Sequence, residues 1–272
     1  MHWSKDFQKK ANAGMAYVSL GRSTRLRDIY IKGKVDVQGI HASQEALEET
    51  ERLQSKFDER MKLINEIREK HWVISYVNVR NGLKCHYEDV AIDNYLMSAD
   101  MFGIGETCLA EGDNVTFDGF KDFTASFGNG KGVAVYSKMD STNRPVVNSV
   151  SSAIFSAIQY RAEEFDVIFL YWSKSTAAET SEVLELLESW VVKNRPTAIL
   201  GDFNTVYSED SKVNKFLMNI GFQQMVTKAT CETGNLIDHI YVNEALRSLN
   251  VSTKQCAAYY SDHDIVSLYI PK

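Results

Sequence analysis

The feature that most constrains the fold is a series of short apolar runs between residues 72 and 272, with helical patterns and polar loops between them. Each run is rich in β-branched or aromatic residues and is bounded by turn residues, which is typical of β-strands. We therefore expect seven strands, at Val73–Val79, Met101–Gly105, Gly132–Ser137, Asp166–Trp172, Thr197–Leu200, Ile237–Val242 and Ile265–Ile270.

Helical patterns separate these strands near residues 86–98, 176–193 and 209–219. In the last of them, apolar residues follow the i, i+3, i+4, i+7 spacing that places them on one helix face. Helices interspersed among this many strands favour two packed mixed sheets with helices outside, an α/β sandwich.

The first 71 residues have a different pattern. Residues 15–40 hold two strand-like runs around a basic turn that contains Arg22, which predicts a short β-ribbon. Residues 43–70 lack Gly and Pro, alternate in charge and begin with a capping residue, Ser43, so we expect a solvated connecting helix. The predicted domains are 1–42, 43–71 and 72–272.

Composition excludes several classes of protein. The longest apolar stretches, such as Val167–Trp172, are far shorter than the ~20 residues of a membrane span, and no apolar signal-peptide core is present. We expect an intracellular protein without membrane contact. The four cysteines form no CxxC pair, which favours buried free thiols over a zinc site or a disulfide framework.

The net charge of −6 is unevenly distributed. Residues 1–42 carry eight basic and three acidic side chains, a net charge of +5, whereas residues 72–272 carry 16 and 25, a net charge of −9. Nucleic-acid-binding proteins usually show a basic footprint. Contact of residues 72–272 with DNA would therefore need a bound cation or a local basic rim. Four basic residues at loops or element ends could form such a rim, or could be ordinary solvated surface: Lys121, Lys131, Arg144 and Lys212.

Polar residues collect where the predicted strands end. Asp202 and Asn204 follow one strand, and alternation along an extended backbone would place them on one side with Phe203 in the core. Acids, amides and histidines also occur at the ends of other strands. Hard oxygen ligands in this number suit Mg²⁺ or Mn²⁺. The ordered set is Asn78, Glu106, Asp202 with Asn204, Asp238, and Asp262 with His263.

At these positions the chain resembles the endonuclease/exonuclease/phosphatase superfamily. The matching segments span residues 72–272 in the order found in that family, and Ser261-Asp262-His263 is the most specific: Ile74–Val79, Gly103–Thr107, Gly132–Ser137, Gly201–Asn204, Leu236–Tyr241 and Ser261–His263. The resemblance implies a deoxyribonuclease-like four-layer α/β sandwich.

The resemblance also implies roles for individual residues. It makes Glu106 the principal metal ligand, with Asn78 beside it and Asp262 near the same cation. Asp202 would orient or deprotonate the attacking water, and Asn204 would hold a phosphate oxygen. His263 would contact the scissile phosphate, and Asp238 would orient that histidine. Tyr171 would touch the phosphate.

The expected substrate depends on the absence of one histidine. Sphingomyelinases and secreted deoxyribonucleases carry a second histidine after the strand that matches Asp166–Trp172, and this sequence has none there. The resemblance therefore favours the branch of abasic-site and transposon-encoded endonucleases. The expected substrate is DNA.

Residues 1–42 resemble the last motif of Pif-family DNA helicases, in which the arginine matching Arg22 contacts the ATP γ-phosphate. No phosphate-binding G-x-x-x-x-G-K-[ST] loop occurs in the chain, so we expect no ATPase activity from it alone. A helicase followed by such an endonuclease is the order in Helitron-type transposon proteins. The chain would then be the C-terminal piece of one, nuclear, with the missing helicase core as a partner. The alternative is an unrelated basic β-ribbon.

Three functions therefore remain open. The first is a Mg²⁺-dependent (or Mn²⁺-dependent) DNA endonuclease. The second is a phosphatase or phosphodiesterase acting on a phosphoinositide, a nucleotide or an RNA end, which the charge of −9 keeps plausible. The third is a catalytically silent DNA- or protein-binding remnant.

Overall fold

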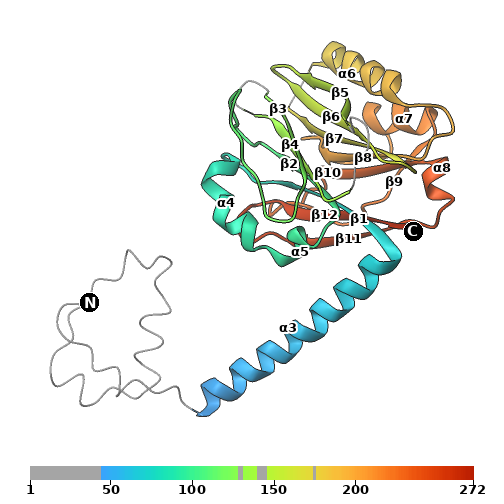
Figure 1. Cartoon of the computed structure of the whole chain (residues 1–272). Coiled ribbons are helices and arrows are strands. Elements are labelled where there is room, and N and C mark those ends of the chain that lie inside the picture. Colours follow the sequence, from blue (N-terminus) through green and yellow to red (C-terminus); the bar gives the residue numbers. More distant parts are fainter. Residues whose placement is uncertain (1–43, 128–130, 140–145, 174–175) are drawn as a thin grey trace. The chain divides into compact units, whose positions relative to one another are not determined.

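The computed structural model describes residues 44–127, 131–139, 146–173 and 176–272 (Figure 1). The predicted β-ribbon, Arg22 and Ser43 lie outside these residues. The connecting helix is present as α3 (Gln44–Lys70). The chain divides into two compact units, and the boundary lies between Ile67 and Arg68. No helix in the described part of the chain is both long enough and apolar enough to cross a bilayer.

The described residues of the second unit form two six-stranded mixed sheets. In the first sheet, β1 pairs parallel with β2 and antiparallel with β12. Its strand order is β11 (Ser252–Ala257), β12 (Asp264–Pro271), β1 (His71–Asn78), β2 (Met101–Gly105), β4 (Val133–Ser137) and β3 (Asp122–Ser126).

The second sheet repeats this arrangement around one parallel pair, β7 with β8. Its order is β5 (Val146–Ser151), β6 (Phe155–Arg161), β7 (Asp166–Trp172), β8 (Thr197–Asp202), β10 (Asp238–Asn243) and β9 (Phe222–Gln224). A short helix, α8 (Glu244–Arg247), follows β10.

The main core lies between the sheets, where alternate side chains of β1, β4, β7 and β12 pack together. Gly103 permits this close approach, because a Cβ there would lie 2.3 Å from Cδ1 of Phe169 on the opposite sheet. A second core joins the other face of β7 and β8 to α6 (Ala177–Trp190) and α7 (Lys212–Asn219). Figure 1 shows α4 and α5 beside the first sheet and α6 and α7 beside the second, which confirms the predicted sandwich.

All seven predicted strands are present, with ends shifted by up to two residues. Five further strands were not predicted, and four of them, β3, β5, β9 and β11, form the outer edges of the two sheets. Edge strands are exposed along one side and carry more polar residues, as in Ser252–Ala257, so their apolar signal is weak. The fifth, β6, is an interior strand that the sequence analysis missed.

One helix prediction was wrong. The helix expected near 86–98 is two helices, α4 (Leu83–Ile92) and α5 (Asn94–Met97), because Asp93 has an extended backbone. Its carboxylate accepts hydrogen bonds from the backbone N–H groups of Tyr95 and Leu96, so the residue caps a new helix.

The cysteine prediction was correct in part. All four thiols are free, but Cys85 and Cys108 are exposed, and Cys231 and Cys256 are half-buried.

Candidate active site

The predicted polar residues meet at the edge where the two parallel strand pairs end. Asn78 lies opposite Gly105 on β2, so Glu106 follows directly at that edge. On the second sheet, Asp202 at the end of β8 lies opposite Tyr171 on one side and Asp238 on the other. The carboxyl ends of parallel strands are a common place for functional residues, because the loops that follow them converge there.

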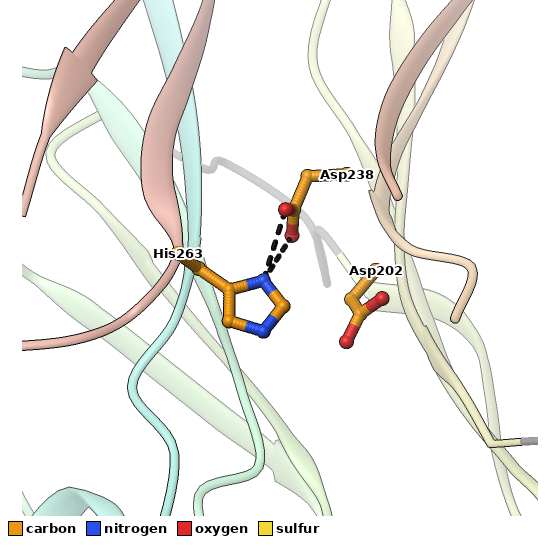
Figure 2. Close-up of side chains that lie close together, drawn as sticks. All are labelled: Asp202, Asp238 and His263. Carbon is orange, nitrogen blue, oxygen red and sulfur yellow. Dashed lines mark hydrogen bonds and ion pairs between the residues drawn. The ribbon is translucent and has the colours of Figure 1, made fainter. Parts of the chain in front are cut away.

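An acid–histidine cluster forms the centre of the site. Potential ligand atoms of Asp202, Asp238 and His263 all lie within 4.8 Å of one another. Nδ1 of His263 is 2.9 Å from the Oδ2 atom of Asp238, and Figure 2 shows the imidazole ring facing both carboxylates. A carboxylate in this position fixes the orientation of the ring and leaves Nε2 available for another partner.

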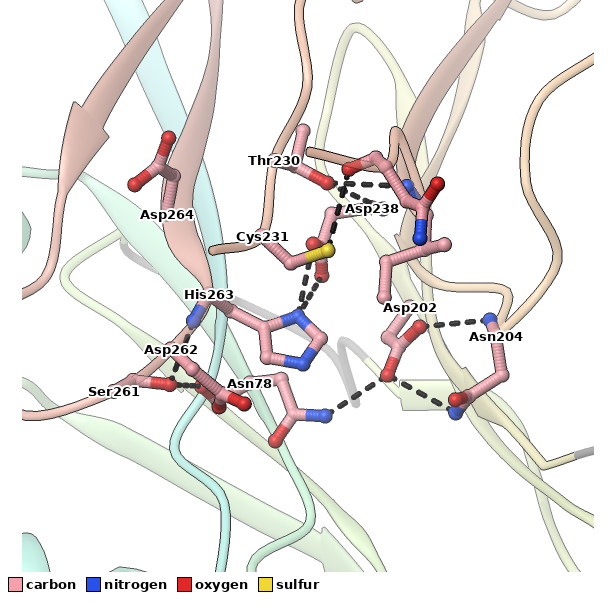
Figure 3. A network of polar contacts seen from close by, with 12 residues as sticks. Asn78, Asp202, Asn204, Thr230, Cys231, Asp238, Ser261, Asp262, His263 and Asp264 are labelled. Carbon is pink, nitrogen blue, oxygen red and sulfur yellow. Dashed lines mark hydrogen bonds and ion pairs between the residues drawn. The ribbon is translucent and has the colours of Figure 1, made fainter. Parts of the chain in front are cut away.

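Two amides hold the buried carboxylate of Asp202. Nδ2 of Asn78 donates to its Oδ2 over 2.9 Å, and Nδ2 of Asn204 donates to the same oxygen over 3.1 Å (Figure 3). The expected alternation does not extend to Asn204, because β8 ends at Asp202 and Asn204 has φ 46°. A tight turn brings the two residues together instead, with the N–H of Asn204 bonded to Asp202 Oδ1 at 2.7 Å. Phe203 is buried, as predicted.

Backbone contacts fix the two residues of the acid–histidine pair. The hydroxyl of Ser261 donates to the Asn78 carbonyl over 2.6 Å and accepts from the N–H of His263, which joins the last loop to β1. On the other side, the fully buried hydroxyl oxygen of Thr230 accepts the N–H of Asp238 over 3.0 Å. The positions of both side chains are therefore set before any substrate binds.

The electrostatics of the cluster are unusual. Burial, and then the nearby charge of Asp238, raise the pKa of Asp202 from 3.8 to about 7. Burial also raises the pKa of Asp238, although the hydrogen bond from His263 opposes it. Burial opposes a charge on His263, but the bond to Asp238 and the charges of Asp238, Asp202 and Asp262 outweigh it and raise the pKa to about 9. At neutral pH the histidine is a cation between buried acids.

The predicted metal ligands lie around this cluster rather than within it. Glu106 is 3.2 Å from the ammonium group of Lys131, and Asp262 is 2.6 Å from the guanidinium of Arg80. The second oxygen of Asp262, Oδ1, is buried and has no hydrogen-bond partner. An unsatisfied carboxylate oxygen is a hard donor of the kind that binds a divalent cation.

Tyr171 is on the same edge, next to Asp202 in register, and its hydroxyl is 3.1 Å from Nζ of Lys131. Among the basic residues considered for a rim, Lys131 is therefore at the site. Lys212 is not, because its ammonium group bonds Ser181 and Ala177 of α6. Arg144 lies outside the described residues.

Sequence reasoning missed the roles of Thr230 and Arg80 and could not select Lys131 from the other lysines. Thr230 had no recognisable motif, because it lies in the connection before β10 and acts through a buried hydroxyl that contacts the backbone of Asp238. His239, which adjoins Asp238, is structural: it stacks on Phe203 with ring centroids 4.7 Å apart, and burial lowers its pKa to about 4.

Comparison with known proteins assigns the chain to a family. The chain belongs to the Endonuclease/Exonuclease/phosphatase family, whose sequence pattern matches residues 75–263. A search of curated proteins gave no match.

Solved structures share the fold. One is the endonuclease domain of TRAS1, a telomere-specific non-LTR retrotransposon, with 14% identity, a TM-score of 0.53, and coverage of 74% of this chain and 98% of that one. Another is an AP endonuclease from Archaeoglobus fulgidus, with 17% identity, a TM-score of 0.56, and coverage of 73% and 98%. A third is the AP endonuclease LMAP from Leishmania major, with 13% identity, a TM-score of 0.56, and coverage of 75% and 89%.

Proposed function

We propose that this protein is a divalent-metal-dependent endonuclease that hydrolyses phosphodiester bonds in DNA. The observation that carries the proposal is the cluster of Asp202, Asp238 and His263, in which a cationic imidazole lies within 4.8 Å of a carboxylate that titrates near neutral pH. Family membership and the likeness to three endonuclease structures support this assignment.

The chain's own residues supply acid–base chemistry and positioning. Asp202 accepts a proton from the attacking water, and a pKa of about 7 suits a general base at neutral pH. Asn78 and Asn204 hold this carboxylate, and the second N–H of Asn204 remains for a phosphate oxygen. His263, held by Asp238, donates from Nε2 to the phosphate as negative charge develops there.

Glu106 and Asp262, together with the side-chain amide oxygen of Asn78, are the residues that would hold the metal. Mg²⁺ is the expected ion and Mn²⁺ the alternative, since every donor in this set is a hard oxygen. When bound, the ion would neutralise phosphate charge and stabilise the leaving oxygen.

DNA is the proposed substrate, and a transposon-encoded protein is the proposed context. The likeness to a retrotransposon endonuclease domain supports this context. The helicase remnant in residues 1–42, its missing helicase core as a partner and a nuclear location belong to the same proposal. One observation favours a smaller phosphate ester instead: residues 72–272 carry a net charge of −9, which repels a polyanion.

The test is a nicking assay on supercoiled plasmid, with parallel substrates that contain an abasic-site analogue or are small phosphate mono- and diesters. We expect nicking in Mg²⁺, none in EDTA, and a loss of about 10²–10⁴-fold in His263→Ala. His86→Ala is the matched control, because His86 is partly exposed, lies 3.8 Å from Asp89 and is not among the clustered residues Asp202, Asp238 and His263. Turnover confined to small esters would replace the DNA assignment, and DNA binding without any turnover would identify a silent remnant.

A further inference from the structure

Two carboxylates expected to hold the metal are each paired with a basic side chain. Lys131 Nζ is 3.2 Å from Glu106, and Arg80 Nη1 is 2.6 Å from Asp262. The basic partners are the exposed members, with 52% and 59% of their side-chain surface accessible, against 15% and 27% for the acids. The acids are thus fixed at the site, while the cations reach in from solvent.

Lys131 has a second partner on the other sheet. Its ammonium group is 3.1 Å from the Tyr171 hydroxyl and 5.5 Å from the centroid of that ring. Since Tyr171 lies beside Asp202 in register, the ammonium group bridges the side of the site that carries Glu106 and the side that carries the proposed base. It uses two of its three donors, on Glu106 and Tyr171.

A half-exposed Lys–Glu pair is a weak interaction, because water screens the charges and both side chains lose conformational freedom. A divalent cation binds the same carboxylate with twice the charge and would displace the lysine. The released ammonium group would still be anchored on the tyrosine ring, at the position where a phosphate oxygen of the substrate would approach.

We propose that Lys131 is an exchangeable counter-ion of Glu106. Its ammonium group pairs with the Glu106 carboxylate before the metal binds. After the metal has displaced it, the same ammonium group pairs with a phosphate of the nucleic-acid backbone. This inference rests on the proposed function for the metal and the DNA. It would give an acidic domain a positive contact that becomes available only once the catalytic site is loaded.

The first test measures metal binding without DNA. Mn²⁺ is titrated calorimetrically into the wild type, Lys131→Met, Lys131→Arg and Lys215→Met. Lys215 is the matched control: it is an exposed lysine on α7, and its ammonium group is 2.9 Å from the carboxylate of Asp210. We expect Mn²⁺ to bind about threefold to fivefold more tightly to Lys131→Met, because the internal competitor is gone. The two other variants should match the wild type. Unchanged or weaker Mn²⁺ binding by Lys131→Met would overturn the exchange.

The second test measures DNA binding by fluorescence anisotropy, in Ca²⁺ and in EDTA. In Ca²⁺ we expect Lys131→Met to bind DNA about tenfold more weakly, as for a lost charge-assisted hydrogen bond. The slope of log K against log salt should fall by about one. In EDTA, where Glu106 still holds the lysine, the difference should shrink to less than about twofold. Equal weakening in both buffers would show a permanent contact and refute the exchange.

The two tests separate this inference from the proposed function. If the wild type bound no DNA in Ca²⁺, the DNA assignment and the phosphate contact would both fail. The Mn²⁺ titration would still decide whether Lys131 competes for Glu106.

Discussion

Replacing Asp202 by asparagine should stabilise the metal-free protein while it removes activity. The carboxyl group is fully buried, and its pKa is raised from 3.8 to about 7 by burial and by Asp238. Because the folded-state pKa is the higher one, the stability that the protonated group provides is fully present below pH 4. It is lost as the pH rises through 7. A difference of about 3 pH units corresponds to about 4 kcal/mol at full ionisation.

Asparagine keeps one hydrogen-bond acceptor but places an amide donor near the amide donors of Asn78 and Asn204. This loss of hydrogen bonding should lower the free energy of unfolding by about 1 kcal/mol. The net gain at pH 8 is then about 3 kcal/mol. At pH 5 the gain should be smaller by about 3 kcal/mol, because the wild-type carboxyl is then largely protonated in the folded state. Urea denaturation of the wild type and Asp202→Asn in EDTA, at both pH values, measures this difference.

Asp166→Asn provides a matched control that should lower the free energy of unfolding instead of raising it. Asp166 is equally buried and lies on the neighbouring strand, but Arg161 and Arg195 contact it at 2.9 and 2.6 Å. Removing this charge leaves two guanidinium groups without their carboxylate, so we expect a loss of about 3 kcal/mol at pH 8. If Asp202→Asn were no more stable than the wild type at pH 8, or if its gain did not change with pH, the electrostatic account of the site would be wrong.

Three further outcomes are expected. The pH profile of kcat/KM should be bell-shaped, falling below about pH 7 as Asp202 takes up a proton and above about pH 9 as His263 loses one; activity that stays unchanged below pH 7 or above pH 9 would contradict the assigned roles. Gly103→Ala should lower the free energy of unfolding by about 1–3 kcal/mol in urea, since its Cβ would clash with Phe169, and unchanged stability would mean that the sheets separate freely. Thr176→Ala should cost about 1 kcal/mol by removing the capping box of α6, and an unaltered urea midpoint would show that the cap contributes nothing.

The sequence predicted the interior of both sheets better than their edges. Interior strands such as β7 are buried on both faces and appear as short, continuous apolar runs rich in β-branched and aromatic residues. An edge strand such as β11 alternates exposed and half-buried polar residues, so its pattern resembles that of a loop. The split between α4 and α5 was missed because Asp93 alone turns the backbone, and an aspartate inside a helical pattern is common.

Some residues of the candidate site could be predicted from the sequence and others could not. Residues at a strand end within a recognisable motif, such as Asp202 at the end of β8 and His263 just before β12, could be selected because the ends of neighbouring strands converge. Contacts made across the two sheets could not be predicted. Thr230 is a different case, because its hydroxyl accepts the N–H of Asp238 only eight residues later in the chain, and no motif marks it. Lys131, in contrast, differs from other lysines only because β4 begins beside the end of β7 in space. Such roles arise from the packing of the sheets and not from any local pattern.

The position of β12 in its sheet has a consequence for synthesis. This strand lies between β11 and β1, and the loop before it bonds to Asn78 across 183 positions of the chain. While residues 261–271 are still inside the ribosome, the first sheet lacks a central strand and the imidazole of His263 is absent. The cluster of Asp202, Asp238 and His263 is therefore incomplete until nearly all of this domain has emerged, and the proposed nuclease activity would begin only then.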